Sequence, residues 1–325
     1  MYSRVLVPLD GSIFAAQALP YARMIAGALN ADIELFQAVP TLTDTVRSWH
    51  MRYDEDDLDT HVPGPSLEQW RDIHHRVVRE AEQELEQQAE GLRAAGFSAR
   101  ARVGVGDAAE AIAEEAEGRA DTLIVMTTHG RSGIARWWIG SVADRLLRIT
   151  TTPALVVRCL GEEMAPAEPR IGTVVLPLDG SRLSEQAVPH AMALSKALDA
   201  RVDVLIAVNS PAYEPIRYPV PEAYPTDLNA RAGEYAAGVV ARLETAGIPA
   251  GASTIEDDPA GAITETAETT PDSIVVMSTH GRSGLKRWML GSVADKVVRH
   301  SGRPVLLVRA REAAAVPAQA PAAAA

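Results

Sequence analysis

Residues 129–144 read His-Gly-Arg-Ser-Gly, then six further residues, then Gly-Ser-Val-Ala-Asp, and residues 280–295 repeat this pattern. The surrounding segments, 128–158 and 279–309, are identical at roughly 18 of about 31 positions. A repeat displaced by about 151 residues has the period of a whole domain and is far too long for a solenoid unit. The stretch therefore predicts that the chain consists of two tandem copies of one domain.

A second landmark lies near the start of each copy. Residues 5–12 read Val-Leu-Val-Pro-Leu-Asp-Gly-Ser, and residues 174–181 read Val-Val-Leu-Pro-Leu-Asp-Gly-Ser, an offset of about 169. Since this offset exceeds that of the first landmark, copy 1 carries about 18 extra residues between the two. The 325 residues amount to about two average domains. We predict domain 1 at 1–160, a linker at 161–171, domain 2 at 172–310 and a disordered Ala/Pro-rich tail at 311–325.

Strand and helix patterns alternate along both copies, which indicates an α/β fold of two tandem doubly wound five-stranded parallel sheets. The segment 122–126 is apolar throughout, as expected of a strand buried on both faces of such a sheet. Pro20 falls inside the first helical pattern, and Pro189 repeats it, which predicts a kink or a late helix start. The elements expected in copy 1 are strands at 4–8, 33–39, 98–103, 122–126 and 154–157 and helices at 15–29, 66–95, 108–117 and 141–148.

The composition argues against several classes of protein. A formal net charge of −12 repels polyphosphate backbones, so we expect no nucleic-acid partner. No run of about 18 apolar residues occurs, so we expect no membrane span, and the first residues do not resemble a secretion signal. The single cysteine, Cys159, cannot form an internal disulfide and is interpreted as an inert thiol in a reducing compartment. These features predict a cytoplasmic protein.

The segments between the second strand and the long helix differ between the copies. Residues 54–59 are acidic in copy 1, whereas residues 211–225 of copy 2 contain five prolines. Both segments follow a strand end, so they are either lids over a ligand or divergent surface loops. The acidic segment lacks the glycine and terminal glutamate of an EF-hand, so we expect no metal there.

Gly140 and Ser141 open the last helix of copy 1 directly after a glycine-containing loop. Free N–H groups at a helix N-terminus attract phosphate, and glycines allow the backbone to approach it. Ser141 could either cap the helix or donate its hydroxyl, and Arg131 and Arg136 add positive charge. The pattern is neither a Walker A loop nor a dinucleotide fingerprint, so a tight turn followed by a capped helix remains an alternative. Copy 2 repeats the arrangement with Gly281, Arg282, Arg287, Gly291 and Ser292.

Both copies resemble universal stress protein (UspA-type) domains, and the chain is similar to the tandem two-domain members of that family. The ATP-binding members carry the pattern G-x-x-G-x9-G-[S/T]. Residues 127–141 and 278–292 match its last three positions, whereas Thr127 and Ser278 replace its first glycine. The replacements place a β-carbon where the family has none.

The resemblance implies a Rossmann-like, adenine nucleotide α-hydrolase-like fold with one ATP site per domain, with or without Mg²⁺. A carboxylate and a glycine after the first strand would lie near the adenosine, the backbone at the end of the second strand would meet adenine, and the glycine-rich segment would hold the phosphates. The last strands, at 153–157 and 304–308, would pair the copies as an internal pseudo-dimer, and two chains could form a homodimer. The expected nucleotide-binding residues are Asp10, Gly11, Val39, Thr127, Gly130, Arg131, Gly140 and Ser141 in copy 1 and Asp179, Gly180, Val208, Ser278, Gly281, Arg282, Gly291 and Ser292 in copy 2.

Other residues near these motifs have simpler interpretations. His129 and His280 are expected to order the loop, because neither copy supplies a nucleophile–base–acid set. Asp10 either contacts ligand or caps the first helix. The tryptophans between the glycines are interpreted as packing anchors or an interface patch. They are Trp137, Trp138 and Trp288.

The sequence thus predicts an ATP-binding stress-response protein with a regulatory role and no dedicated catalytic residues. Two alternatives remain, a nucleotide-independent interaction or dimerisation module and a weak ATPase. An adenylating or ATP-pyrophosphatase enzyme is disfavoured, because such enzymes carry an S-G-G-x-D-S loop where this chain has Pro-Leu-Asp-Gly-Ser at 8–12.

Overall fold

One continuous ten-stranded sheet runs through the protein. The computed structural model describes residues 2–53, 65–128, 139–159, 168–208, 228–280 and 290–310. The strands hydrogen-bond in the order β3-β2-β1-β4-β5-β10-β9-β6-β7-β8. Their bounds are β1 Arg4–Pro8, β2 Asp32–Val39, β3 Ala99–Val105, β4 Thr122–Thr127, β5 Ala154–Val157, β6 Thr173–Leu178, β7 Arg201–Val208, β8 Ala250–Glu256, β9 Ser273–Ser278 and β10 Val305–Val308.

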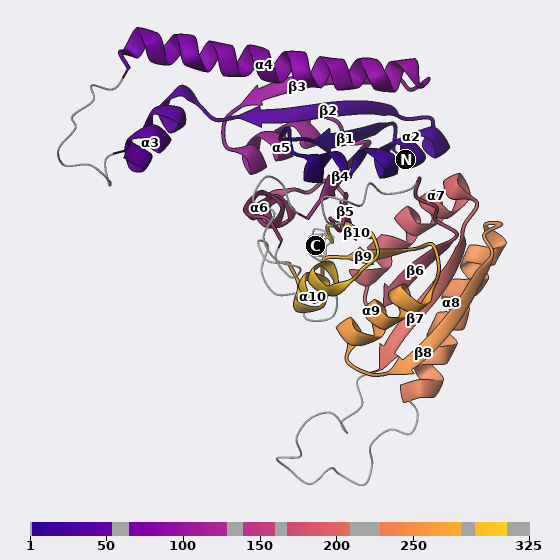
Figure 1. Ribbon diagram of the computed structural model, residues 1–325. Coiled ribbons are helices and arrows are strands. Elements are labelled where there is room, and N and C mark those ends of the chain that lie inside the picture. Colours follow the sequence, from indigo (N-terminus) through magenta and orange to yellow (C-terminus); the bar gives the residue numbers. More distant parts are fainter. Residues whose placement is uncertain are drawn as a thin grey trace, which may run out of the picture.

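The two halves of the sheet join at an antiparallel seam between β5 and β10. All pairs within each half are parallel. At the seam, Val305 lies opposite Val156, and Leu306 lies opposite Leu155. Figure 1 shows these two strands at the centre of the molecule, between the two halves. The predicted α/β fold with five parallel strands per copy and pairing through the last strands is therefore confirmed, with the two sheets merged into one.

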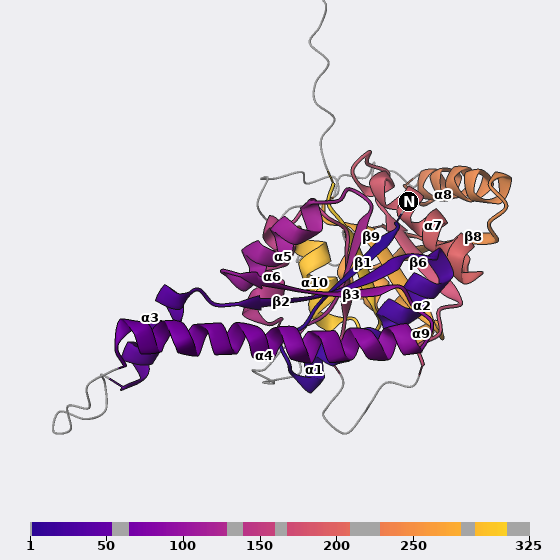
Figure 2. The same cartoon turned by 90° about the horizontal axis from the view of Figure 1, so that it is seen from above.

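Helices cover both faces of the sheet. On one face α4 packs on β2 and β3, and α8 packs on β7 and β8. Figure 2 shows α4 running along the outside of the sheet. The opposite face carries α5, α6, α9 and α10. The helices are α1 Ile13–Ala16, α2 Leu19–Leu29, α3 Leu42–Tyr53, α4 Leu67–Ala94, α5 Ala108–Glu117, α6 Ser141–Ile149, the 3₁₀ turn η1 Ser184–Ala187, α7 Val188–Leu198, α8 Leu228–Thr245, α9 Pro259–Thr269 and α10 Ser292–His300.

The alternation of side chains along each strand creates two hydrophobic cores, one on each face. In β1, Val5 and Val7 face the core under α2 and α4, whereas Leu6 faces the core under α5 and α6. Both cores contain residues from both copies. The halves therefore share buried apolar surface in addition to the backbone seam.

Pro20 resolves into a late helix start. The short helix α1 ends at Ala16, and α2 begins at Leu19. Pro20 is therefore the second residue of α2, in the first turn, where its missing N–H costs nothing. Copy 2 repeats the break, with η1 followed by α7 and Pro189 near its start. Of the two outcomes expected for these prolines, the late start is correct.

A helix that the sequence pattern did not indicate, α3, follows the second strand of copy 1 and begins at Leu42. Its start is stabilised locally. Asp44 N donates to Thr41 Oγ1 at 3.1 Å, and Thr41 Oγ1 donates to Asp44 Oδ2 at 2.6 Å. Trp49 of α3 packs edge-on against Trp70 of α4, with ring centroids 5.7 Å apart. This contact with α4 stabilises a helix whose sequence alone shows no strong pattern.

Several sequence-based expectations fall outside the described residues. They concern the acidic segment 54–59, the proline-containing segment 211–225, most of the linker and the tail. Within the described ranges, no helix combines the length and hydropathy needed to cross a membrane.

Candidate functional site

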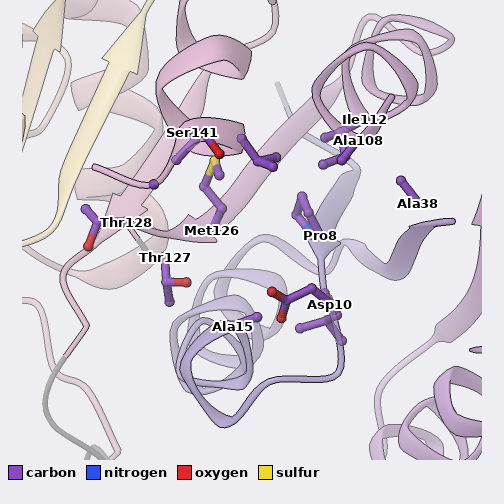
Figure 3. Close-up of a pocket in the computed structure, with 14 residues that line it drawn as sticks. Pro8, Asp10, Ala15, Ala38, Ala108, Ile112, Met126, Thr127, Thr128 and Ser141 are labelled. Carbon is purple, nitrogen blue, oxygen red and sulfur yellow. The ribbon is translucent and has the colours of Figure 1, made fainter. Parts of the chain in front are cut away.

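A pocket of about 290 Å³ lies at the carboxyl ends of β1 and β4, on the side of the sheet covered by α5 and α6. Carboxyl ends of parallel strands are the usual place for ligands in open α/β sheets. Figure 3 shows Asp10 on one side of this pocket, Ser141 on another and Met126 between strand and helix. Most of the remaining lining is apolar and comes from β1, β2 and α5. It includes Pro8, Leu9, Ala38, Ala108 and Ile112.

The turn after β1 holds the carboxylate of Asp10 at the pocket. Ser12 N donates to Asp10 Oδ1 at 3.0 Å, and Gly11 has φ 76°, a conformation that favours glycine. Ser12 is the residue that caps α1, because its Oγ accepts from Ala15 N at 3.1 Å. Asp10 therefore does not cap the helix, and its side chain lines the pocket. Figure 3 shows its carboxylate directed toward Thr127.

The N-terminus of α6 opens onto the same pocket. Gly140 is the N-cap residue and makes no side-chain cap, so Ser141 occupies the first helical position instead of capping the helix. Gly140 N donates to Thr128 O at 2.7 Å, which fixes the helix start against the end of β4. The N–H groups of the first turn have no acceptor inside the helix, and the dipole adds partial positive charge there. Ser141 is exposed at this end.

The second copy builds the same site, with a pocket of about 420 Å³. Asp179 Oδ1 accepts from Ser181 N at 2.9 Å, and Gly180 has φ 78°. Gly291 caps α10 as Gly140 caps α6, and its N–H donates to Thr279 O at 3.0 Å. A β-carbon on Gly291 would lie 2.6 Å from that oxygen, so this position accepts only glycine without a shift of the backbone.

The residues that replace the family's first glycine are buried at the ends of β4 and β9. Ser278 Oγ donates to His280 O at 2.5 Å and accepts from His280 N at 3.2 Å. Thr279 Oγ1 lies 3.1 Å from His280 Nδ1. These contacts fix the first residue of the loop, in line with the expectation that His280 orders it. Thr127 is the equivalent of Ser278 and lines the first pocket.

The structure brings together half of the expected binding residues. Gly11, Gly180, Val39 and Val208 lie beside the pockets but are not part of their lining. Gly130, Arg131, Gly281 and Arg282 lie outside the described residues, as do Arg136, Arg287, His129 and the three tryptophans. Those that line a pocket are Asp10, Thr127, Gly140 and Ser141 in copy 1 and Asp179, Ser278, Gly291 and Ser292 in copy 2.

Ala38 and Ala207, which no motif marks, also line the pockets, one residue before Val39 and Val208. The alternation of side chains along a strand could have indicated that these alanines face the pockets. Phe36 belongs to the core under α5, so Ala38, two residues on, faces the same side, whereas Val39 faces the other. The apolar α5 residues were missed because an alanine-rich helix gives no signal of ligand contact.

A charged cluster joins the helices that open the two pockets. Arg148 donates to both carboxylate oxygens of Asp144, at 2.9 and 3.0 Å, and Arg299 pairs with Asp295 in the same way. Arg299 Nη2 also reaches Asp144 Oδ1 across the seam at 3.2 Å. The hydrogen bonds from Arg148, aided by the charge of Arg299, lower the pKa of Asp144. The Asp144 carboxylate therefore accepts hydrogen bonds from arginines of both domains.

Titratable side chains are scarce in the pockets. Among the described lining residues, the first pocket has Asp10, and the second has Asp179 and His280. Over the described ranges, no group of three or more His, Cys, Asp or Glu side chains could hold a metal ion.

A model of the Universal stress protein family matches residues 1–158 and again 170–309. A universal stress protein of Mycobacterium tuberculosis is 26% identical over 324 residues, covering 97% of each chain. One from Methanocaldococcus jannaschii is 32% identical over 139 residues, which are 42% of this chain and 81% of its own. Among solved structures, a universal stress protein from Archaeoglobus fulgidus has a TM-score of 0.66 at 18% identity, covering 95% of this chain and 99% of that one. This last likeness shows a shared fold.

Proposed function

Since the chain belongs to the universal stress protein family, we propose that each of its two domains binds ATP and that nucleotide occupancy regulates the protein's association with partners. The observation that carries this proposal is the N-terminus of α6, which no side chain of its N-cap residue closes and which opens onto a largely apolar pocket. A helix N-terminus suits phosphate, and an apolar pocket suits a purine base. α10 repeats the arrangement in the second copy.

The lining residues fit the parts of an adenine nucleotide. The apolar patch formed by Pro8, Ala38 and Ile112 would accept the base. The Asp10 carboxylate would accept a hydrogen bond from a ribose hydroxyl. Ser141 and the first N–H groups of α6 would donate to the phosphates. Mg²⁺, where present, would shield the phosphate charge in this acidic protein.

We propose a regulatory role because the described lining offers little for catalysis. Asp10 is the one titratable side chain in the described lining of the first pocket, and it already accepts the Ser12 N–H. A hydrolase needs a group that activates water, positioned within hydrogen-bond reach of it. In the first pocket, slow hydrolysis would draw on the helix N-terminus.

The test is equilibrium binding of ATP to the full chain and to the double variant Ser141→Asp, Ser292→Asp. An aspartate in the first turn favours the helix dipole, so the fold should keep its stability. The same charge repels phosphate, and two unit charges 4 Å apart interact by about 4 kcal/mol near a protein surface. We expect at least a tenfold loss of affinity at both sites.

Leu67→Asp is the matched control, because Leu67 begins α4, is 61% exposed and is not among the residues that line either pocket. It should leave ATP affinity unchanged. Wild-type protein that binds no ATP at millimolar concentration would overturn the proposal and favour an interaction module. ADP formation at saturating ATP, measured on the same samples, distinguishes a weak ATPase from a binding protein.

A further inference from the structure

The repeat places two equivalent contact regions, here called corners, where the start of one domain meets a helix of the other. The first corner contains Tyr2 and His190, the second contains Ile171 and Tyr21, and the two differ. At the first, Tyr2 precedes β1 and its hydroxyl lies 2.5 Å from Nδ1 of His190 on α7. The repeat aligns Tyr2 with Ile171 and His190 with Tyr21 of α2. Figure 1 shows the start of the chain beside α2 and α7, which pack against each other. Isoleucine has no polar atom, so the second corner cannot form the bond that closes the first.

Copy 1 also carries a hydrogen-bonded carboxylate next to Tyr2 in the fold. Asp121 accepts from Ser3 Oγ and, at 3.1 Å, from Arg119 Nη2. The equivalents in copy 2 of Ser3, Arg119 and Asp121 are Gly172, Thr270 and Asp272. The second corner thus retains the acid but has lost both side chains that satisfy it.

A cavity of about 240 Å³ occupies the second corner. Thr152 of copy 1 is replaced there by Arg303, which adds a guanidinium to the lining. Arg303 lines the same cavity as Tyr21. Burial raises the pKa of Tyr21, and the charge of Arg303 opposes that rise. The charged and polar residues of the lining are Tyr21, Glu168, Arg170, Asp272, Ser273 and Arg303.

The charges of this lining are not paired with one another. Arg170, Arg303, Glu168 and Asp272 make no side-chain hydrogen bond or ion pair within the described part of the chain, whereas Asp121 makes several. Two cations and two anions around one cavity give a lining of zero net charge. Arg303 is half-buried, and Glu168, Arg170 and Asp272 are exposed. A ligand of one sign could pair with two of these four groups, whereas a ligand that carries both charges could pair with all four.

We propose that this cavity binds a small zwitterion that carries one carboxylate and one ammonium group, of the size of a short α-amino acid. The guanidiniums of Arg303 and Arg170 would receive the carboxylate, and Asp272 with Glu168 would receive the ammonium group. The volume equals that of about eight liquid waters, which suits such a molecule. Because the cavity lies at the amino ends of the strands, it is separate from both ATP pockets.

Three probes of matched shape test the proposal by ligand-observed NMR and calorimetry on the full chain: L-alanine, L-lactate and isopropylammonium. L-lactate replaces the ammonium of alanine by hydroxyl, and isopropylammonium replaces its carboxylate by methyl. We expect L-alanine to bind in the millimolar range and each of the other two to bind at least fivefold more weakly. Failure of L-alanine to bind at 50 mM (about tenfold above that range) overturns the proposal. Equal binding of L-lactate also overturns it, since it indicates a simple carboxylate site.

Two variants locate the site. Arg303→Thr introduces the residue that the first corner carries as Thr152, so the fold tolerates it. This variant should bind L-alanine at least fivefold more weakly than the wild type and should keep its ATP affinity unchanged. Asp272→Asn should remove the preference for L-alanine over L-lactate. Retention of wild-type L-alanine affinity in Arg303→Thr would place the binding elsewhere and refute the assignment.

Discussion

Gly291→Ala tests whether the junction between β9 and α10 depends on a close approach of two backbone segments. The added β-carbon would lie 2.6 Å from Thr279 O, which also accepts the Gly291 N–H. That oxygen cannot move easily, because Thr279 N donates to Val308 O at 2.9 Å. Overpacking costs about 1–3 kcal/mol, and weakening a buried hydrogen bond costs about 0.5–1.5 kcal/mol. We expect the free energy of unfolding to fall by about 2–3 kcal/mol.

Urea unfolding followed by circular dichroism measures this loss, and calorimetry measures its effect on ATP. If each domain binds one ATP, the stoichiometry should fall from two to one, because only the second pocket is altered. Gly238→Ala on α8 is the control. A β-carbon there meets no atom within 4 Å, and alanine favours a helix by about 0.5–1 kcal/mol, so stability should rise. A Gly291→Ala protein as stable as wild type with two intact sites would refute the reasoning.

Two further predictions concern the interface between the domains. Burial lowers the pKa of His190 from 6.5 to about 4, so the folded protein prefers the neutral ring, and stability is lost as the pH falls from 6.5 toward 4. His190→Gln should reduce that loss by about 1–2 kcal/mol. This is less than the whole pKa shift would contribute, because the ring keeps some solvent contact. Urea unfolding at pH 7 and at pH 4.5 measures this loss. An equal loss of unfolding free energy in both proteins would contradict the prediction. Arg299→Met removes the hydrogen bonds to Asp144 and Asp295 and should cost about 1 kcal/mol in low salt and less in 1 M salt, a difference that unfolding at the two ionic strengths measures. A salt-independent loss would indicate packing instead of charge.

Much of the fold could be predicted because its signals are local. The uniformly apolar run at 122–126 indicates a buried parallel strand, and β4 forms there. Pro20 limits where α2 can begin, and the structure places it at the helix start. α3 escaped prediction because its stability depends on Trp70, which lies on another helix and is brought close only by the tertiary fold.

The parts of the candidate site that belong to a sequence motif could be predicted. The parts that line the pocket only because of how the strands and helices pack could not. Asp10 and Gly140 stand in repeated motifs, and both line a pocket. Ala38 and Ile112 contribute through the faces they occupy, and their residue types carry no chemical signal. The polar corner lined by Tyr21 and Arg303 depends on contacts between the two domains, which neither copy reveals by itself.

The seam between β5 and β10 affects how the interface between the domains can evolve. In a homodimer every substitution appears twice, once on each side of the symmetry axis, so the two halves of an interface must change together. In this chain the partners are joined covalently, and the pairing also survives dilution because its effective concentration is fixed by the linker. Each half can therefore acquire mutations alone. The unequal corners, Tyr2 with His190 on one side and Ile171 with Tyr21 on the other, are variation that a homodimer could not encode.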